Sequence, residues 1–231
     1  AISMFKNEED IAEFSLKHMI DEGVDGLIVA DNMSTDSTRK KIEIAQEYAQ
    51  SKGIIFDIVE DNEVGYHQSR KMTDLARMAV EKYGATWIIP FDCDELWWRA
   101  DERVGNIIRN TEGLTHLYAR ITNYFPSALD LPGDNPFETI LWRQPEPQEL
   151  PKVAFKWFDD AVIQQGNHAV VIPSLDKCVV EDVQLAHFPY RTFEQFKSKA
   201  RNGALAYKAT DLPYDIGAHW RSYGQILEQH G

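Results

Sequence analysis

The sequence predicts an α/β fold, in which a mostly parallel central sheet is flanked by helices and a mixed α+β C-terminal half follows. Three observations predict it. In the first hundred residues, short apolar runs alternate with segments whose apolar residues recur at helical spacing. The apolar runs are continuous, which is typical of parallel strands covered on both faces. After about residue 113, strand-like pieces and a proline-rich loop replace this alternation.

The first half contains four predicted strands with helices between them. The strands are expected at residues 2–5, 27–30, 54–59 and 86–91. The helices follow from their apolar spacing, as with Ile42, Ala45 and Ala49 in the second one. Glycine just past the last periodic residue is a natural helix stop, because it accepts the left-handed conformation. The three helices are therefore expected to end at Gly23, Gly53 and Gly84.

The second half is expected to add strands and one helix to the same domain, which spans residues 1–231. The strands are predicted at residues 117–125, 169–172 and 179–188, with the proline-rich loop at 126–151. Thr192 and Gln195 form a capping-box pattern that opens the helix. Its apolar side is expected to carry Phe193, Phe196, Ala200 and Tyr207.

Composition narrows the range of partners. Of 231 residues, 43% are hydrophobic, which is enough for a full core without a structural metal, so a bound metal would serve chemistry. Acidic residues number 37 and basic ones 24, so the net charge is -13. This balance argues against sequence-independent binding to a phosphate backbone, and no nucleic acid is expected as a partner.

Cysteine usage and hydropathy bear on location. Cys93 and Cys178 are the two cysteines, and neither lies in a CxxC or zinc-type spacing. No apolar stretch approaches the roughly 20 residues that a membrane-spanning helix needs. We therefore expect a cytoplasmic protein without a transmembrane segment, and peripheral association with a membrane stays open.

Polar residues follow all four predicted strands of the first half. Ligands of open α/β sheets bind outside the carboxyl ends of the strands, so these positions are where a site is expected. The four segments are Lys6-Asn7-Glu8, Asp31-Asn32, Glu60-Asp61-Asn62 and Asp92-Cys93-Asp94-Glu95.

Asp92 and Asp94 lie one residue apart at the end of a buried run. Two adjacent carboxylates repel each other unless a cation or protons lie between them, and oxygen ligands suit Mg or Mn. A divalent ion held there could clamp a diphosphate. A solvated loop or a helix-capping cluster would also explain the pattern.

A second polar run, residues 31–38, leads into the second helix. Ser34, Thr35 or Asp36 could cap that helix. The same run supplies acceptors for ribose hydroxyls and base amides, and the two interpretations are compatible. The sequence has no GxGxxG after the first strand, no P-loop and no GxSxG, so dinucleotide, P-loop and hydrolase sites are not predicted.

The order of these motifs resembles the family 2 type glycosyltransferases of GT-A fold, which have a Rossmann-like sheet. The resemblance covers roughly residues 1–100. Gly166-Asn167-His168 and the HFPYR segment, residues 187–191, are similar to a subgroup that also carries DxDE. The motifs in order are Lys6-Asn7-Glu8-Glu9, residues 31–38, Gly65 with Arg70, and Asp92-Cys93-Asp94-Glu95.

The resemblance implies a metal-dependent, inverting glycosyltransferase that moves a hexosyl or related group from a nucleotide sugar to an acceptor hydroxyl. Residues 1–112 would form the nucleotide-binding half and 113–231 the acceptor-side half. The donor would be a UDP- or GDP-sugar. Residues implied to contact the nucleotide are Asn7, Glu8, Asp31, Asp36, Arg70 and Asp92. Residues implied to bind Mg or Mn are Asp92, Asp94 and His187.

The general base is less well marked. Asp160 and His168 are the favoured candidates, because Gly166-Asn167 makes a turn that could present His168 in the cleft. Glu181-Asp182 and Asp159 are alternatives. The five basic residues of segment 187–208 could face either a diphosphate or solvent.

Two other functions compete with this interpretation. A sugar-1-phosphate nucleotidyltransferase shares the general topology, but it would require a glycine-rich phosphate loop near residues 6–9, which the sequence lacks. A non-catalytic module that binds a nucleotide or sugar would keep the pocket without turnover.

Overall fold

A computed structural model of the protein describes residues 1–171 and 178–230, with the side chains of 178–181 and 230 left out. Its first half is a parallel sheet in the order β1-β2-β3. The strands are β1 (Ile2–Phe5), β2 (Gly26–Asp31) and β3 (Ile55–Glu60). The helices are α1 (Ala12–Asp21), α2 (Thr38–Ser51) and α3 (Gln68–Tyr83). These elements confirm the predicted alternation.

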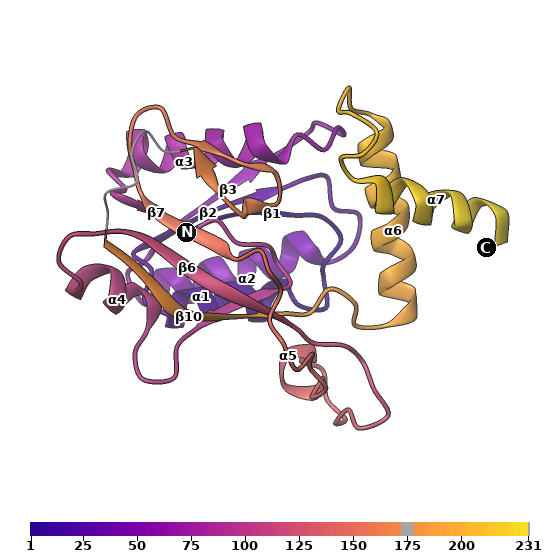
Figure 1. Cartoon of the computed structure of the whole chain (residues 1–231), viewed down its shortest axis with the longest axis horizontal. Helices are drawn as coiled ribbons and strands as arrows, with labels where there is room; N and C mark the ends of the chain where they lie inside the picture. Colours follow the sequence, from indigo (N-terminus) through magenta and orange to yellow (C-terminus); the bar gives the residue numbers. More distant parts are fainter. Residues whose placement is uncertain (172–177, 231) are drawn as a thin grey trace.

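The middle strand β2 shows how the sheet is covered. Leu27 and Val29 pack in the cluster that contains residues of α1 and α2, whereas Ile28 and Ala30 pack with residues of α3. Successive side chains of a strand point to opposite faces, so one apolar run serves both layers. Figure 1 shows α1 and α2 on one side of the strands and α3 on the other. Gly84 ends α3 in the left-handed conformation, as predicted.

A second, mixed sheet follows in the order β4-β7-β6-β10-β5. β10 pairs parallel with β6 and antiparallel with β5, and β7 pairs antiparallel with both β6 and β4. The strands are β4 (Trp87–Ile88), β5 (Glu95–Trp98), β6 (Leu114–Asn123), β7 (Lys152–Lys156) and β10 (Cys178–His187). Helix α4 (Val104–Asn110) connects β5 to β6. The predicted mixed second half is confirmed.

The predicted strand at 86–91 is wrong in length, because the segment changes partners. Trp87 and Ile88 pair with β7, and a parallel bridge then links Pro90 to Ile2 of β1. Ile2 N donates to Ile89 O at 3.0 Å, and Phe91 N donates to Ile2 O at 3.1 Å. The segment thereby connects the two sheets, and only Trp87 and Ile88 form β4.

The remaining elements lie around the mixed sheet. The proline-rich loop contains a short helix, α5 (Pro136–Thr139). β8 (Val162–Ile163) and β9 (Val170–Val171) form a hairpin through the 3-10 turn η1 (Gln165–Asn167). The predicted strand at 169–172 corresponds to β9, and Ile172 lies outside the described residues.

Helices α6 (Phe193–Lys208) and α7 (Ala218–His230) pack on each other and project from one side of the sheets (Figure 1). Thr192 Oγ1 accepts a hydrogen bond from Gln195 N, so the predicted cap is confirmed. Phe193 is not on the packed side as expected, because it is 68% exposed, whereas Ala200 and Tyr207 are buried. The reason is its position in the first turn, where Thr192 turns the chain and directs the ring outward.

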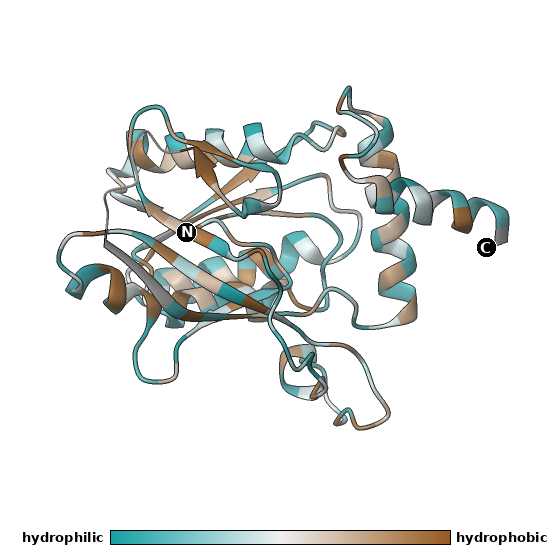
Figure 2. Cartoon of the chain, viewed as in Figure 1, coloured by the Kyte–Doolittle hydropathy of each residue, from teal (hydrophilic) through white to brown (hydrophobic). Residues whose placement is uncertain are grey.

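Burial agrees with the hydropathy of the chain. Figure 2 shows hydrophobic residues along the inner strands and mostly hydrophilic residues in the loops. Among the described residues, no helix is both long enough and apolar enough to cross a membrane.

Gly105 of α4 tests how tightly the elements approach. A Cβ at this position would lie 2.1 Å from the backbone oxygen of Gly23. Gly105→Ala is expected to lower the free energy of unfolding by about 1–3 kcal/mol through overpacking, measured by urea denaturation. Asn106→Ala on the same helix should stay within about 0.5 kcal/mol of the parent. Equal stability of the two variants would contradict the close approach of α4 to Gly23.

Candidate active site

A cavity of about 270 Å³ lies at the carboxyl ends of the parallel strands, where the sequence predicts a site. Its walls come from the segment after β1, the start of α3, the segment between β4 and β5, the end of β10, and helices α6 and α7. Its polar lining residues are Lys6, Glu8, Asn32, Gln68, Asp92, Asp94, His187, Lys199 and Asn202. The site therefore draws residues from both halves of the chain.

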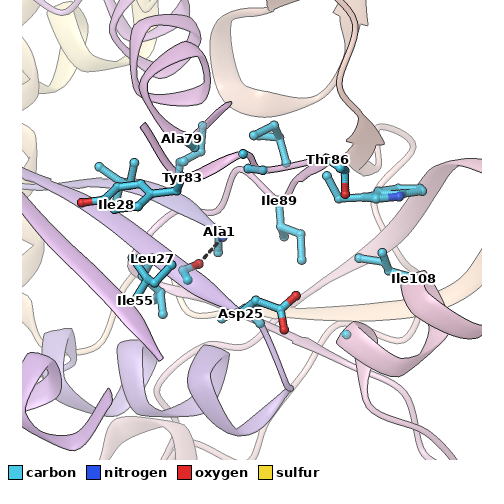
Figure 3. Close-up of a pocket in the computed structure, with 18 of the residues that line it drawn as sticks. Ala1, Asp25, Leu27, Ile28, Ile55, Ala79, Tyr83, Thr86, Ile89 and Ile108 are labelled. Carbon is cyan, nitrogen blue, oxygen red and sulfur yellow. Dashed lines mark hydrogen bonds between the residues drawn. The ribbon is translucent and has the colours of Figure 1, made fainter. Parts of the chain in front are cut away.

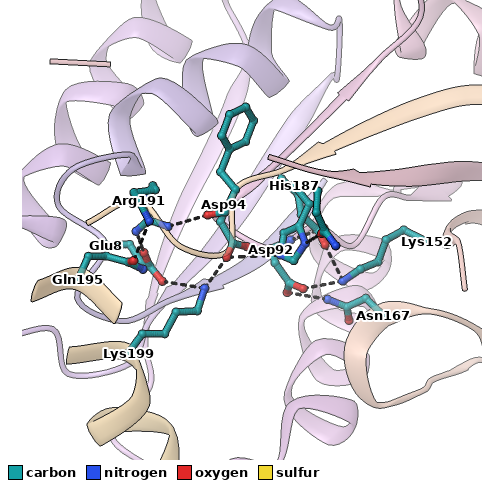
Figure 4. A network of polar contacts seen from close by, with 12 residues as sticks. Glu8, Asp92, Asp94, Lys152, Asn167, His187, Arg191, Gln195 and Lys199 are labelled. Carbon is teal, nitrogen blue, oxygen red and sulfur yellow. Dashed lines mark hydrogen bonds and ion pairs between the residues drawn. The ribbon is translucent and has the colours of Figure 1, made fainter. Parts of the chain in front are cut away.

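Strand pairing brings Asp94 and His187 together. β10 pairs antiparallel with β5 so that His187 lies opposite Glu95, and Phe188 N donates to Asp94 O at 2.8 Å. His187 Nε2 lies 3.6 Å from Asp94 Oδ2. Lys199 Nζ forms an ion pair with the same oxygen (Figure 4). Burial opposes the ionisation of Asp94, but the Lys199 ammonium holds its pKa well below the usual range.

A hydrogen-bond network sets the tautomer of His187. Its Nδ1 lies 2.7 Å from Asn123 Oδ1. That oxygen also accepts from Gln148 Nε2 at 2.8 Å, while Asn123 Nδ2 donates to Gln144 Oε1 at 3.0 Å. Because Asn123 Oδ1 is the acceptor, Nδ1 carries the proton of the neutral ring, and Nε2 presents its lone pair towards Asp94.

Asp94 and His187 fit a divalent cation as two of its ligands. Two ligand atoms that each lie about 2.1 Å from one ion are about 3–4 Å apart, which matches the spacing of Oδ2 and Nε2. A metal-ligating histidine usually donates its other ring N–H to an acceptor, as His187 Nδ1 does to Asn123 Oδ1. Within residues 1–171 and 178–230, no group of three acidic, histidine or cysteine side chains surrounds such a position. The remaining ligands would come from substrate and water.

Asp92 has a different environment from Asp94. Its Oδ2 accepts from Lys152 Nζ at 2.6 Å, and its Oδ1 accepts from Gln68 Nε2 at 3.1 Å and Asn167 Nδ2 at 3.0 Å. Lys152 Nζ also lies 2.8 Å from Glu95 Oε1. Asp92 thus links α3, η1 and β7. Its side chain stays 33% exposed towards the cavity, so it can still meet a ligand hydroxyl.

Glu8 is held by Arg191 of the HFPYR segment. Arg191 Nη2 forms an ion pair with Glu8 Oε2, and Arg191 Nε lies 2.6 Å from Asp10 Oδ2. Arg191 Nη1 also donates to Phe188 O at 3.1 Å. Burial raises the pKa of Glu8, and Lys199 and Arg191 partly offset that rise. The arrangement makes Glu8 part of the frame that joins β1 to α6.

The polar run 31–38 folds back on itself. Asp31 Oδ1 accepts from Ser34 N at 3.1 Å, and Asn7 Oδ1 accepts from Thr35 N at 2.7 Å. Asp36 Oδ1 accepts from Thr38 N at 2.9 Å. The N-cap position of α2 is Ser37, whose side chain makes no capping hydrogen bond, so the predicted cap at Ser34, Thr35 or Asp36 is wrong. Among the described lining residues, the cavity wall here is Lys6 and Asn32, with Lys6 Nζ donating to Asn32 O at 2.7 Å.

Six predicted site residues do not line the cavity, namely Asn7, Asp31, Asp36, Arg70, Asp160 and His168. Arg70 is exposed and forms ion pairs with Glu63 and Asp74 on the outer side of α3. Asp160 is exposed in the turn between β7 and β8, where Trp157 N donates to Thr86 O. That turn follows the end of β7 opposite to Lys152, so the structure does not bring Asp160 to Asp92 or Asp94.

His168 lies much nearer to the site. It is half-buried after η1, and its Nδ1 donates to Pro151 O at 3.0 Å. A carbonyl can only accept, so Nδ1 carries the proton of the neutral ring and Nε2 carries the lone pair. Burial and the nearby Lys152 lower the pKa of His168. The ring is therefore neutral near pH 7 and can accept a proton.

Sequence reasoning did not identify three residues that hold the site together, namely Gln68, Lys152 and Lys199. Lys152 precedes the apolar run of β7, and a lysine entering a buried strand signals a buried acidic partner. Lys199 belongs to the basic segment 187–208, yet nothing in helical spacing singles it out from its neighbours. Gln68 is the first residue of α3 and gave no signal.

A second cavity, of about 370 Å³, lies at the opposite edge of the parallel sheet (Figure 3). Apolar side chains such as Leu27, Ile28 and Ile89 form much of its wall. The Ala1 ammonium donates to Gly26 O at 2.6 Å beside it. This cavity lies at the amino ends of the strands, and the charged side chains among its described lining residues, Asp25 and Arg109, pair with each other. We therefore place the site in the first cavity.

No protein-family model matches the chain, and no curated protein matches it. Several solved structures are similar to the chain. A mannosyltransferase from Pyrobaculum calidifontis in complex with GDP-Man and Mn²⁺ is 14% identical with a TM-score of 0.49, covering 97% of this chain and 69% of that one. GalNAc-T7 with UDP, GalNAc and Mn²⁺ is 11% identical with a TM-score of 0.47, covering 99% and 55%.

A third structure, glucosyl-3-phosphoglycerate synthase from Mycobacterium tuberculosis with Mn²⁺, UDP and glucosyl-3-phosphoglycerate, is 18% identical with a TM-score of 0.32. The match covers 54% of this chain and 43% of the synthase chain. The chain thus spans between about two fifths and about seven tenths of the structures to which it is similar. The fold and site define an α/β protein with a charged cavity at the strand carboxyl ends.

Lys152 tests the buried charge network. Lys152→Met would leave Glu95 and Asp92 without their shared cation, and Glu95 is almost fully buried. We expect the free energy of unfolding to fall by about 3–5 kcal/mol in urea denaturation. Lys156→Met, at the exposed end of the same strand, should change it by less than about 0.5 kcal/mol. A loss below about 1 kcal/mol for Lys152→Met would contradict the network.

The pKa of His168 offers a test of its surroundings. A histidine whose folded pKa is depressed contributes stability above its unfolded pKa of about 6.5 and loses it as pH falls. NMR titration of the His168 ring, assigned with His168→Gln, should give a pKa below about 6.5. His168→Gln should also lose less stability than the parent between pH 7.5 and 5.5. A ring pKa above 7 would contradict the assigned environment.

Proposed function

We propose that the protein is a metal-dependent, inverting glycosyltransferase of GT-A type that transfers a sugar from a UDP- or GDP-sugar to an acceptor hydroxyl. The single observation that carries the proposal is the pairing of Asp94 with His187 in a cavity at the strand carboxyl ends. The order of the motifs along the chain, described above, supports the same class.

Asp94 Oδ2 and His187 Nε2 would hold Mg or Mn in this proposal. When bound, such an ion supplies a Lewis acid that stabilises the leaving nucleoside diphosphate. Asn123 keeps the His187 ring in the tautomer that this role requires, because Asn123 Oδ1 accepts a hydrogen bond from Nδ1–H. Asp94 stays ionised across the physiological range, since its pKa is held low.

The nucleotide would lie over the half formed by residues 1–112. Lys6 and Asn32 line the cavity there and offer a cation and an amide to the donor. Asp92, which is partly exposed to the same cavity, would accept a hydrogen bond from a ribose hydroxyl. Asp31, Asn7 and Asp36 would act indirectly, because their carboxylate or amide oxygens shape the loop that carries Asn32.

His168 is the better placed of the two candidate bases. Its Nε2 would take the proton of the acceptor hydroxyl as the acceptor oxygen bonds to the anomeric carbon. The bond from that carbon to the diphosphate oxygen breaks in the same displacement, which inverts the configuration. Neither candidate lines the cavity, but His168 directly follows Asn167, whose amide donates to Asp92 Oδ1 at 3.0 Å, whereas Asp160 is exposed in the turn after β7.

Asp94→Asn tests the proposal with little change in side-chain shape. With UDP- and GDP-hexoses and Mn²⁺ as probes, we expect sugar transfer or donor hydrolysis to fall about 100-fold or more, because the amide is a poor ligand. Asp160→Asn should retain the parent rate. Circular dichroism and the melting temperature would show that both variants fold. An unchanged rate in Asp94→Asn, or no nucleoside diphosphate binding by the parent protein with Mn²⁺, would refute the proposal.

His168→Gln tests the assignment of the base. We expect kcat for transfer to fall by about 10²–10⁴-fold, with KM for the donor nearly unchanged, because the base acts on the acceptor. An unchanged kcat would move the role to another residue. Metal and nucleotide binding without turnover across a screen of acceptors would instead favour the non-catalytic module.

A further inference from the structure

Lys199 lies where the proposed cation would be expected. Its ammonium pairs with Asp94 Oδ2, the same oxygen that lies 3.6 Å from His187 Nε2 (Figure 4). Lys199 Nζ also lies 3.8 Å from Glu8 Oε1. Asp94 is therefore already paired with a cation that belongs to the chain, and the same ammonium lies close to Glu8.

Glu8 is a weaker alternative partner for Lys199 than Asp94, because Glu8 Oε1 lies 3.8 Å from Lys199 Nζ and the charge of Glu8 is already matched by Arg191. The other Glu8 oxygen, Oε2, is engaged by Arg191, whose guanidinium is itself fixed by Asp10. An ammonium and a divalent ion on one carboxylate oxygen repel each other strongly. Cation binding at Asp94 and His187 therefore requires Lys199 to leave Asp94. The diphosphate of an entering nucleotide is a stronger anionic partner for Lys199 than Glu8, whose charge Arg191 already neutralises.

The two lysines of the site differ in their freedom to move. Lys152 is 4% exposed and contacts two carboxylates, so it is fixed. Lys199 is 23% exposed, lines the cavity and contacts one carboxylate within hydrogen-bond distance. A lysine carries its charge on a flexible four-carbon stem, so its ammonium can swing while the α6 backbone stays in place.

We propose that Lys199 occupies the cation position while no donor is bound, and that it transfers to the donor diphosphate when the nucleotide enters. This inference rests on the proposed function. It makes Lys199 a positioning residue for the cation and a binding residue for the diphosphate. Cation and nucleotide then bind with positive coupling, and the coupling is reciprocal.

The proposal predicts effects of opposite sign when Lys199 is removed. Without the ammonium, Asp94 is free, so the cation alone binds more tightly. The diphosphate loses its lysine, so the nucleotide binds less tightly at saturating cation. A lysine that merely neutralised Asp94 would give the first effect without the second.

The experiment measures Mn²⁺ binding by electron paramagnetic resonance, with and without UDP or GDP, and corrects for the Mn²⁺–nucleotide complex in solution. In Lys199→Met, Mn²⁺ alone should bind about tenfold more tightly than in the parent protein, and the nucleotide about tenfold more weakly at saturating Mn²⁺. Lys199→Gln, which can still hydrogen-bond to Asp94, should show the same signs if Lys199→Met does not fold.

Lys197→Met is the matched control, because it removes the same charge from the same helix. Lys197 lies over the exposed ring of Phe193, with no described contact to Asp94. It should leave both affinities within about twofold. Unchanged or weaker Mn²⁺ binding in Lys199→Met, or unchanged nucleotide binding, would overturn the inference. Failure of the proposed function is distinct, since the parent protein would then bind neither probe, or Asp94→Asn would bind Mn²⁺ equally well.

Discussion

The charged cavity depends on one constraint: carboxylates buried at the strand ends must be neutralised inside the protein. Glu95 is matched by Lys152, Glu8 by Arg191 and Asp94 by Lys199. A buried charge without a partner costs several kcal/mol, so each pairing fixes the element that supplies the cation. Through these contacts the second half of the chain is tied to the parallel sheet, and the walls of the cavity acquire defined positions.

The two acids of the Asp92-Cys93-Asp94 motif have different roles because different residues contact them. Asp92 is bound by three donors from three elements and serves mainly as a junction. Asp94 is bound by one lysine and faces a histidine with a free lone pair. The two residues lie in a turn before β5, in which Glu95 N donates to Asp92 O at 3.1 Å, so strand alternation does not set the directions of their side chains. Contact partners, rather than spacing, therefore decide which acid can bind a cation.

Much of the fold could be predicted from the sequence, because it depends on local periodicity. The helices ending near Gly23, Gly53 and Gly84 follow from 3.6-residue spacing, and β1 to β3 from continuous apolar runs. The strand at 86–91 was predicted too long, since its division between two sheets depends on strands that are distant in sequence. The same limit applies to Lys152 and Lys199, which meet Asp92 and Asp94 across 60 and 105 residues. Periodicity carries no information on such partners.

The net charge of -13 poses a problem for any protein that must bind an anion such as a nucleoside diphosphate. The basic residues of segment 187–208 do not all lie at the site. Arg191 and Lys199 point into the site, whereas Arg201 and Lys208 line a groove between α6 and α7 on the other side of the helix. Arg191 is bound to two acids, so its charge is not available to a ligand. An incoming anion therefore meets Lys199 and Lys6 as the accessible cations among the described lining residues, and Lys199 is bound to the acid that would receive the metal. In the proposed function, anion and cation binding would be linked through this single side chain, and an acidic protein would admit a diphosphate without a permanently positive cavity.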